Sequence, residues 1–100
     1  MPLDLLILKT LALGPNHGFG ITLHIQSVSE GQLRLEEGSL YPALHRLDRR
    51  GLVSAEWRVS ENGRRARYYA LTDAGRERLR EAERQWQDLA EGVGKVLRFA

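Results

Sequence analysis

The sequence has no cysteine, one methionine and three prolines among its 100 residues. The lack of cysteine excludes a disulfide framework and a thiolate metal site, as is typical of proteins in a reducing cytoplasm. Long apolar runs are missing too. The stretch 5–13 is interrupted by Lys9 and Thr10 and is too short to cross a bilayer. It also lacks the basic leader of a signal peptide, so we expect a cytoplasmic protein without membrane partners.

Patterns typical of enzymes and metal sites are also lacking. The three histidines, His17, His24 and His45, fall on different predicted elements, without metal-ligand spacing or a companion carboxylate motif. The two glycines around Phe19 lack the length and the preceding strand of a phosphate-binding loop. We therefore expect no enzymatic activity, no cofactor and no metal.

The residues that are present suit a small globular domain, with 42% hydrophobic and 28% charged residues. A chain of this size buries a modest core, so a partner subunit is a plausible source of further stability. The net charge is only +2, but segment 46–67 holds seven arginines against three acidic residues. Such a basic segment in a near-neutral chain is typical of a polyanion site, although a solvated charged face is the alternative.

The N-terminal third of the chain predicts two helices. Apolar residues surround most of segment 3–13, and Gly14-Pro15 ends this first helix. The second helix runs from about residue 19 to residue 29, and Gly31 ends it. Its predicted buried stripe consists of Ile21, Ile25 and Val28.

A third helix is predicted to begin near Gly38 or Ser39, because Pro42 lacks a backbone donor and is tolerated only in a first turn. Gly51 is the expected C-cap. The buried stripe of this helix consists of Leu40, Leu44 and Leu47. The opposite face carries Tyr41, His45, Asp48 and Arg49, flanked by Arg46 and Arg50.

Two strand-like segments, 53–59 and 66–71, flank Asn62-Gly63, which is a strong hairpin signal. A two-residue turn there gives the cross-strand pairs Trp57–Tyr68 and Arg58–Arg67. Leu71 then falls on the arginine face, so a longer loop with the opposite parity is the alternative. The sequence leaves the register of this hairpin open.

The last predicted helix is long. Thr72 is a good N-cap, and the helix continues to about Leu97. Its apolar residues, at heptad spacing, are Leu79, Ala82, Trp86, Leu89, Val93 and Val96. About 25 residues span about 40 Å, more than a domain of this size covers alone. We therefore predict contact with a second subunit, and intramolecular packing is the alternative.

This order of elements predicts a mostly α fold with a small β-hairpin (α+β), a winged helix-turn-helix. Residues 1–71 form the DNA-binding domain, and residues 72–100 form a dimerisation helix that makes one compact unit with the N-terminal helix. In this architecture the third helix enters the major groove, and the hairpin, or wing, lies along the phosphate backbone.

The chain resembles the PadR family of transcriptional regulators along nearly its whole length. The matching stretches are Leu3–Leu8, Gly14–Ile21, Gly38–Leu47, Gly51–Val53 and Tyr68–Gly75. The single long C-terminal helix resembles the small subfamily. The resemblance implies a homodimer, a palindromic operator in double-stranded DNA and, usually, repression relieved by a small molecule or stress signal. It also implies that Ser39, Tyr41 and Pro42 lie at the DNA-facing end of the third helix.

The residues predicted to bind DNA are Ser39, Tyr41, Pro42, His45, Arg46, Arg49, Arg58, Arg64, Arg65 and Arg67. Two alternatives are that the Tyr41 ring packs on the domain and shows only its hydroxyl, and that His45 is a solvated residue. Trp57 is predicted to be wing core, and contact with a ligand is the alternative. One of Tyr68 and Tyr69 is predicted to lie in the core, and the sequence does not say which.

The residues predicted to form the dimer interface are Leu5, Leu8, Leu79, Ala82, Trp86, Leu89, Val93 and Val96. Packing in the dimer core is the first interpretation of Trp86. Members of the resembled family hold effectors between the first and last helices, so a second interpretation is a slot for a planar effector, formed by two copies of Trp86 beside the small Ala82. The alternative to DNA binding as a whole is a winged helix that binds other proteins.

Overall fold

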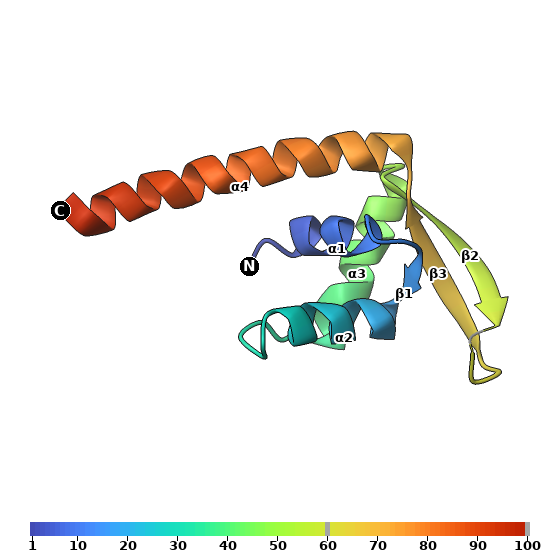
Figure 1. Cartoon of the computed structure of the whole chain (residues 1–100). Helices are drawn as coiled ribbons and strands as arrows, with labels where there is room; N and C mark the ends of the chain where they lie inside the picture. The colour runs from blue at the N-terminus through green and yellow to red at the C-terminus, as the bar shows by residue number, and fades with distance from the viewer. Residues whose placement is uncertain (60, 100) are drawn as a thin grey trace.

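The computed structural model describes residues 1–59 and 61–99, and it has the predicted order of three helices, a hairpin and a long helix. The elements are α1 (Leu3–Leu11), β1 (Asn16–His17), α2 (Gly18–Val28), α3 (Glu37–Arg49), β2 (Val53–Val59), β3 (Arg65–Leu71) and α4 (Asp73–Phe99). The first three helices pack together, the hairpin extends from one side, and α4 runs past α1 and projects far beyond it (Figure 1). The α+β winged helix with a long C-terminal helix is confirmed.

The core lies between α1, α2, α3 and the near end of the sheet. The predicted leucine stripe of α3 is fully buried, together with residues of α1 and α2. Val28 was predicted to be buried with Ile21 and Ile25, and this was wrong, because Val28 is 66% exposed. Val28 is the last residue of α2, and at this end of the helix its side chain lies in solvent rather than in the core.

The third helix begins one or two residues earlier than predicted, at Glu37, so Pro42 lies in the second turn rather than the first. Pro42 leaves the carbonyl of Gly38 without its usual helical N–H partner. Gly38 and Pro42 are both exposed, so water can hydrogen-bond this carbonyl and the helix tolerates the proline. Helix α1 ends at Leu11, two residues before the predicted end.

The sheet has three strands in the order β1-β3-β2, all antiparallel. Trp57 pairs with Arg67 and Arg58 with Ala66, so of the two registers that the sequence left open, the one with the longer loop is observed. In this register Leu71 lies opposite Val53, on the face that packs on the core. Burial of that face determines the register, because a one-residue slip would turn its apolar residues to solvent. Strand β1 was not predicted, since two residues carry no periodicity.

Helix α4 is tied to the domain by its first turns only. The Thr72 hydroxyl accepts a hydrogen bond of 3.0 Å from the Gly75 amide, which confirms the predicted N-cap. Leu79 is buried, and Lys9 of α1 pairs with Glu83 at 3.1 Å. Beyond this point the apolar residues of α4 are exposed. Within residues 1–59 and 61–99, no helix is long and apolar enough to span a membrane.

Candidate nucleic-acid interface

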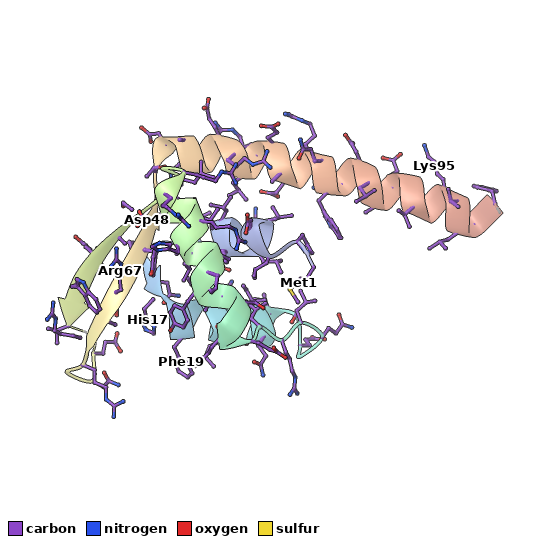
Figure 2. The ribbon with its side chains drawn as sticks, turned by 180° about the vertical axis from the view of Figure 1, so that it is seen from behind. Met1, His17, Phe19, Asp48, Arg67 and Lys95 are labelled. Carbon is purple, nitrogen blue, oxygen red and sulfur yellow. The ribbon has the colours of Figure 1, made fainter. Side chains whose placement is uncertain are left out.

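The outward face of α3 is fully available to a partner. The six predicted residues on this helix, Ser39, Tyr41, Pro42, His45, Arg46 and Arg49, are all exposed. They are held outward because Leu40, Ala43, Leu44 and Leu47 fill the core from the other side of the same helix. Figure 2 shows this helix from the side opposite to Figure 1, with the wing next to it.

Tyr41 combines the two interpretations that the sequence left open. Its side chain is 48% exposed, yet its ring packs against the start of α2. A Cβ placed on Gly18 would lie 2.8 Å from both the ring and the hydroxyl oxygen of Tyr41, so only glycine fits there with the ring in this position. The start of α2 therefore positions Tyr41 while part of the side chain stays in solvent.

The arginines of the two wing strands lie on opposite faces. Arg65 and Arg67 pair with Val59 and Trp57, on the same face as the buried Val53 and Tyr69. That face continues from the core toward α3. Arg58 lies on the other face, where it pairs with Glu56 and its guanidinium carbon lies 5.2 Å from the Tyr68 ring centroid. Arg64 is exposed in the loop at the wing tip.

An ion pair joins the wing to α3. Nη2 of Arg67 lies 3.7 Å from Oδ2 of Asp48 (Figure 2). Tyr69 is buried nearby, and burial raises the pKa of its phenol, an effect that Arg67 opposes and that Asp48 and Tyr41 reinforce. Of the two neighbouring tyrosines, Tyr69 is thus the core residue. The sequence placed Asp48 on the outer face of α3 but gave no sign of its partner, since the two residues are far apart in the chain.

Arg46 is the one predicted α3 residue that has a partner on α1. Its Nη2 lies 3.3 Å from Oδ1 of Asp4, and both side chains are partly exposed. Arg46 therefore lies on the edge of α3 that borders α1, rather than on the edge next to the wing.

His17, which the sequence analysis considered as a metal ligand and set aside, has a structural role. Nδ1 of His17 accepts a hydrogen bond of 3.1 Å from the Gly20 amide and so caps α2. The His17 ring also meets the Tyr68 ring edge-on, with centroids 5.2 Å apart. These contacts fix the start of α2 against the sheet. In the described part of the chain, no cluster of three His, Asp or Glu side chains could hold a metal.

The residues predicted for the dimer interface fall into two groups. Leu8 and Leu79 are 1% and 6% exposed and belong to the core of the single chain, because α1 and the start of α4 bury each other. Leu5 and Ala82 are half-buried. The exposed members are Trp86, Leu89, Val93 and Val96. Trp86 and Ala82 border a cavity of about 480 Å³ between α1, the end of α3 and α4.

Comparison with known proteins identifies the family. The transcriptional regulator PadR-like family matches residues 7–81, from α1 through the wing to the start of α4. The chain belongs to this family. The transcriptional regulator Rv3488 of Mycobacterium tuberculosis is 43% identical over 77 residues, which cover 77% of this chain and 68% of that protein.

Solved structures of PadR-like proteins have the same fold. A PadR family transcriptional regulator from Eggerthella lenta superposes with a TM-score of 0.80 at 35% identity, covering 98% of this chain and 83% of that one. A PadR-like transcriptional regulator from Bacillus cereus gives a TM-score of 0.82 at 26% identity, covering 98% and 93%. The family and these structures are described as transcriptional regulators, and transcription regulation is therefore the functional class of this PadR-like chain.

Proposed function

We propose that this PadR-like chain is a homodimeric repressor that binds a palindromic site in double-stranded DNA and is released by a small molecule or stress signal. Helix α3, the recognition helix, enters the major groove, and the wing lies along the phosphate backbone. Membership of a transcriptional regulator family supports DNA as the partner.

One observation carries the proposal. The exposed polar face of α3 and the arginine-bearing face of the wing lie next to each other, and the Asp48–Arg67 ion pair joins them. Tyr41, His45 and Arg49 offer hydrogen-bond donors for base edges and phosphates. Arg65 and Arg67 supply charge for the backbone beside them. A winged helix that binds other proteins has no need of this concentration of cations.

The exposed stripe of α4 supports the dimer. Leu89, Val93 and Val96 repeat at heptad spacing, and they are 59%, 48% and 62% exposed. A second copy related by a two-fold axis would bury the same stripe from both chains. It would also set two recognition helices about one turn of DNA apart, ~34 Å, which is why we propose a palindromic site.

The test is selection of bound sequences from random duplex DNA, followed by affinity measurements against salt concentration. Recovery of an inverted repeat and a steep loss of affinity with salt are the expected results. Binding without sequence preference would contradict a specific operator. Absence of binding would favour the protein-binding alternative. A reporter gene behind the recovered operator then separates repression from activation.

The roles of the wing and the recognition helix can be separated by substitution. Replacing Arg64 and Arg65 by alanine should weaken binding to all sequences and flatten the salt dependence, because phosphate contacts are lost. His45→Ala or Tyr41→Ala should instead alter sequence preference. Replacing Arg80 and Arg84, two exposed arginines of α4, by alanine is the matched control for charge. A wing variant that changes only preference would contradict this division of roles.

The effector part of the proposal rests on the cavity that Trp86 and Ala82 border. In a dimer, two copies of Trp86 would form an apolar slot suited to a flat aromatic molecule. Trp57→Phe leaves Trp86 as the sole tryptophan, so its fluorescence should fall as a flat aromatic effector is added. If no compound in a diverse panel changed the Trp86 fluorescence, the proposed effector site would be rejected, and the proposal of DNA binding would be unaffected.

A further inference from the structure

The wing carries a large aromatic residue that the sequence assigned to its core, and this assignment was wrong. Trp57 is 57% exposed. It lies on the face that carries Val53 and Ala55, which pack into and against the core, but it is farther along β2, in the hairpin that extends away from the helices (Figure 1). Leaving so much of an indole ring in water is unfavourable, so a partner that covers it would gain from the contact.

Two guanidinium groups lie over this ring. The guanidinium carbon of Arg65 is 5.0 Å from the Trp57 ring centroid, and that of Arg67 is 6.0 Å away. Both distances are within the range of cation–π attraction. Arg67 is held from the other side by Asp48 of α3. The indole therefore organises two cations on the face of the wing from which Arg67 reaches Asp48 of the recognition helix.

An apolar ring flanked by two cations matches the chemistry of the DNA backbone, where phosphates alternate with deoxyribose rings that present C–H groups. We propose that Trp57 contacts the backbone of bound duplex DNA, with its ring against a deoxyribose and with Arg65 and Arg67 on the adjacent phosphates. This inference rests on the proposed DNA-binding function and adds Trp57 to the DNA-binding residues, among which the sequence analysis did not count it.

A stacked base from single-stranded nucleic acid is the competing occupant of an exposed aromatic ring. One feature favours the duplex backbone. The ring lies on the same face of the wing as Arg67, which pairs with Asp48 of α3, and a helix of this kind fits the major groove of a duplex.

The first test compares Trp57→Ala with Arg65→Ala on the duplex recovered by selection, over a series of salt concentrations. Trp57→Ala removes a contact but no charge, so Kd should rise about fivefold at every salt concentration, with the salt slope unchanged. Arg65→Ala should instead reduce the slope by about one. An unchanged affinity for Trp57→Ala overturns the proposed contact. So does a slope reduced as in Arg65→Ala, because the ring would then act only by supporting the arginines.

The second test needs no stable alanine variant. The full chain labelled with 5-fluorotryptophan has two ¹⁹F resonances, one for each tryptophan, and Trp57→Phe assigns them. The selected duplex should shift the Trp57 resonance, and its separate strands should shift it less. An unshifted Trp57 resonance in a saturated complex overturns the contact while DNA binding stands. A larger shift with single strands overturns it in favour of base stacking. If the unaltered chain binds no DNA, both the contact and the proposed function fail.

Discussion

The two ends of α4 carry one heptad pattern but lie in different surroundings. At the start of the helix, Gly75 and Leu79 are buried against the other elements of the chain. We call residues 1–59 and 61–79, which include this start of α4, the body. In the last turns, residues 88–99, which we call outer α4, the side chains of Leu89, Val93 and Val96 are about half exposed or more. Outer α4 extends past every other element (Figure 1).

The difference shows what a heptad pattern can and cannot establish. The spacing predicts that one face of a helix prefers an apolar environment, and it does so equally for both ends of α4. It does not say whether that environment comes from the same chain or from another. The body supplies it for Leu79, whereas outer α4 is left with an uncovered stripe. This division is the physical basis for proposing that the body binds DNA and outer α4 binds a second copy.

The largest expected effect is a difference in stability when leucine is replaced by alanine in the body and in outer α4. Leu44→Ala leaves a cavity in the body and should lower the free energy of unfolding by about 2–5 kcal/mol. Leu89→Ala, at 59% exposure, should change it by no more than about 0.5 kcal/mol at protein concentrations where the chain is monomeric. Urea unfolding at a series of protein concentrations measures both changes in the free energy of unfolding.

The concentration series is also the control. If outer α4 binds a second copy, the effect of Leu89→Ala should grow as the concentration rises, while that of Leu44→Ala should not depend on association in the same way. If both variants lost the same free energy of unfolding at high dilution, outer α4 would be covered within its own chain, and the comparison would fail.

A glycine at the start of α4 gives the next largest effect. A Cβ at Gly75 would lie 2.0 Å from the carbonyl oxygen of Leu52, a backbone atom that cannot rotate away. Gly75→Ala must therefore separate α4 from the body, and we expect a loss of about 1–3 kcal/mol. Thermal unfolding followed by circular dichroism measures it. Unchanged stability would mean that the first turn of α4 is not packed as tightly as described.

The same substitution in outer α4 should have the opposite sign. A Cβ at Gly92 would meet no atom within 4 Å in residues 1–59 and 61–99, and glycine is unfavourable in a helix interior. Gly92→Ala should therefore stabilise α4 by about 0.5–1 kcal/mol, measured as for Gly75→Ala. A loss of stability instead, confined to high protein concentration, would place the backbone of a second copy close to Gly92 and sharpen the account of the interface.

Most of the body could be predicted because its signals are local. The leucine stripe of α3, the capping Thr72 and the hairpin around Gly63 each follow from residues a few positions apart. The position of Pro42 and the exposure of Val28 were misjudged, since each depends on where a helix begins or ends, and neighbouring elements decide that.

The candidate interface was predicted less completely. The exposed face of α3 and the arginine content of the wing were evident from the sequence, but the face on which each arginine lies depends on a hairpin register that the sequence left open. The Asp48–Arg67 pair follows from that register, whereas Trp57 is exposed because it lies farther along β2 than the residues that pack on the core. A pattern argument also could not show that Leu8 would be buried by its own chain.

The smallest expected effect is on the pH dependence of stability, and it comes from the phenol of Tyr69 in the body. Burial raises the pKa of Tyr69 above its usual value of about 10. Because the folded state holds this proton more tightly than the unfolded state, the stabilisation is complete below about pH 10 and is lost as the pH rises through the folded pKa. Tyr69→Phe should therefore differ from the unaltered chain by a constant free energy of unfolding near neutral pH, and that difference should shift in favour of the phenylalanine variant at alkaline pH. Urea midpoints measured across this range test it. Parallel curves throughout would mean that the phenol is in water, and the wing would then not be packed on the body at Tyr69.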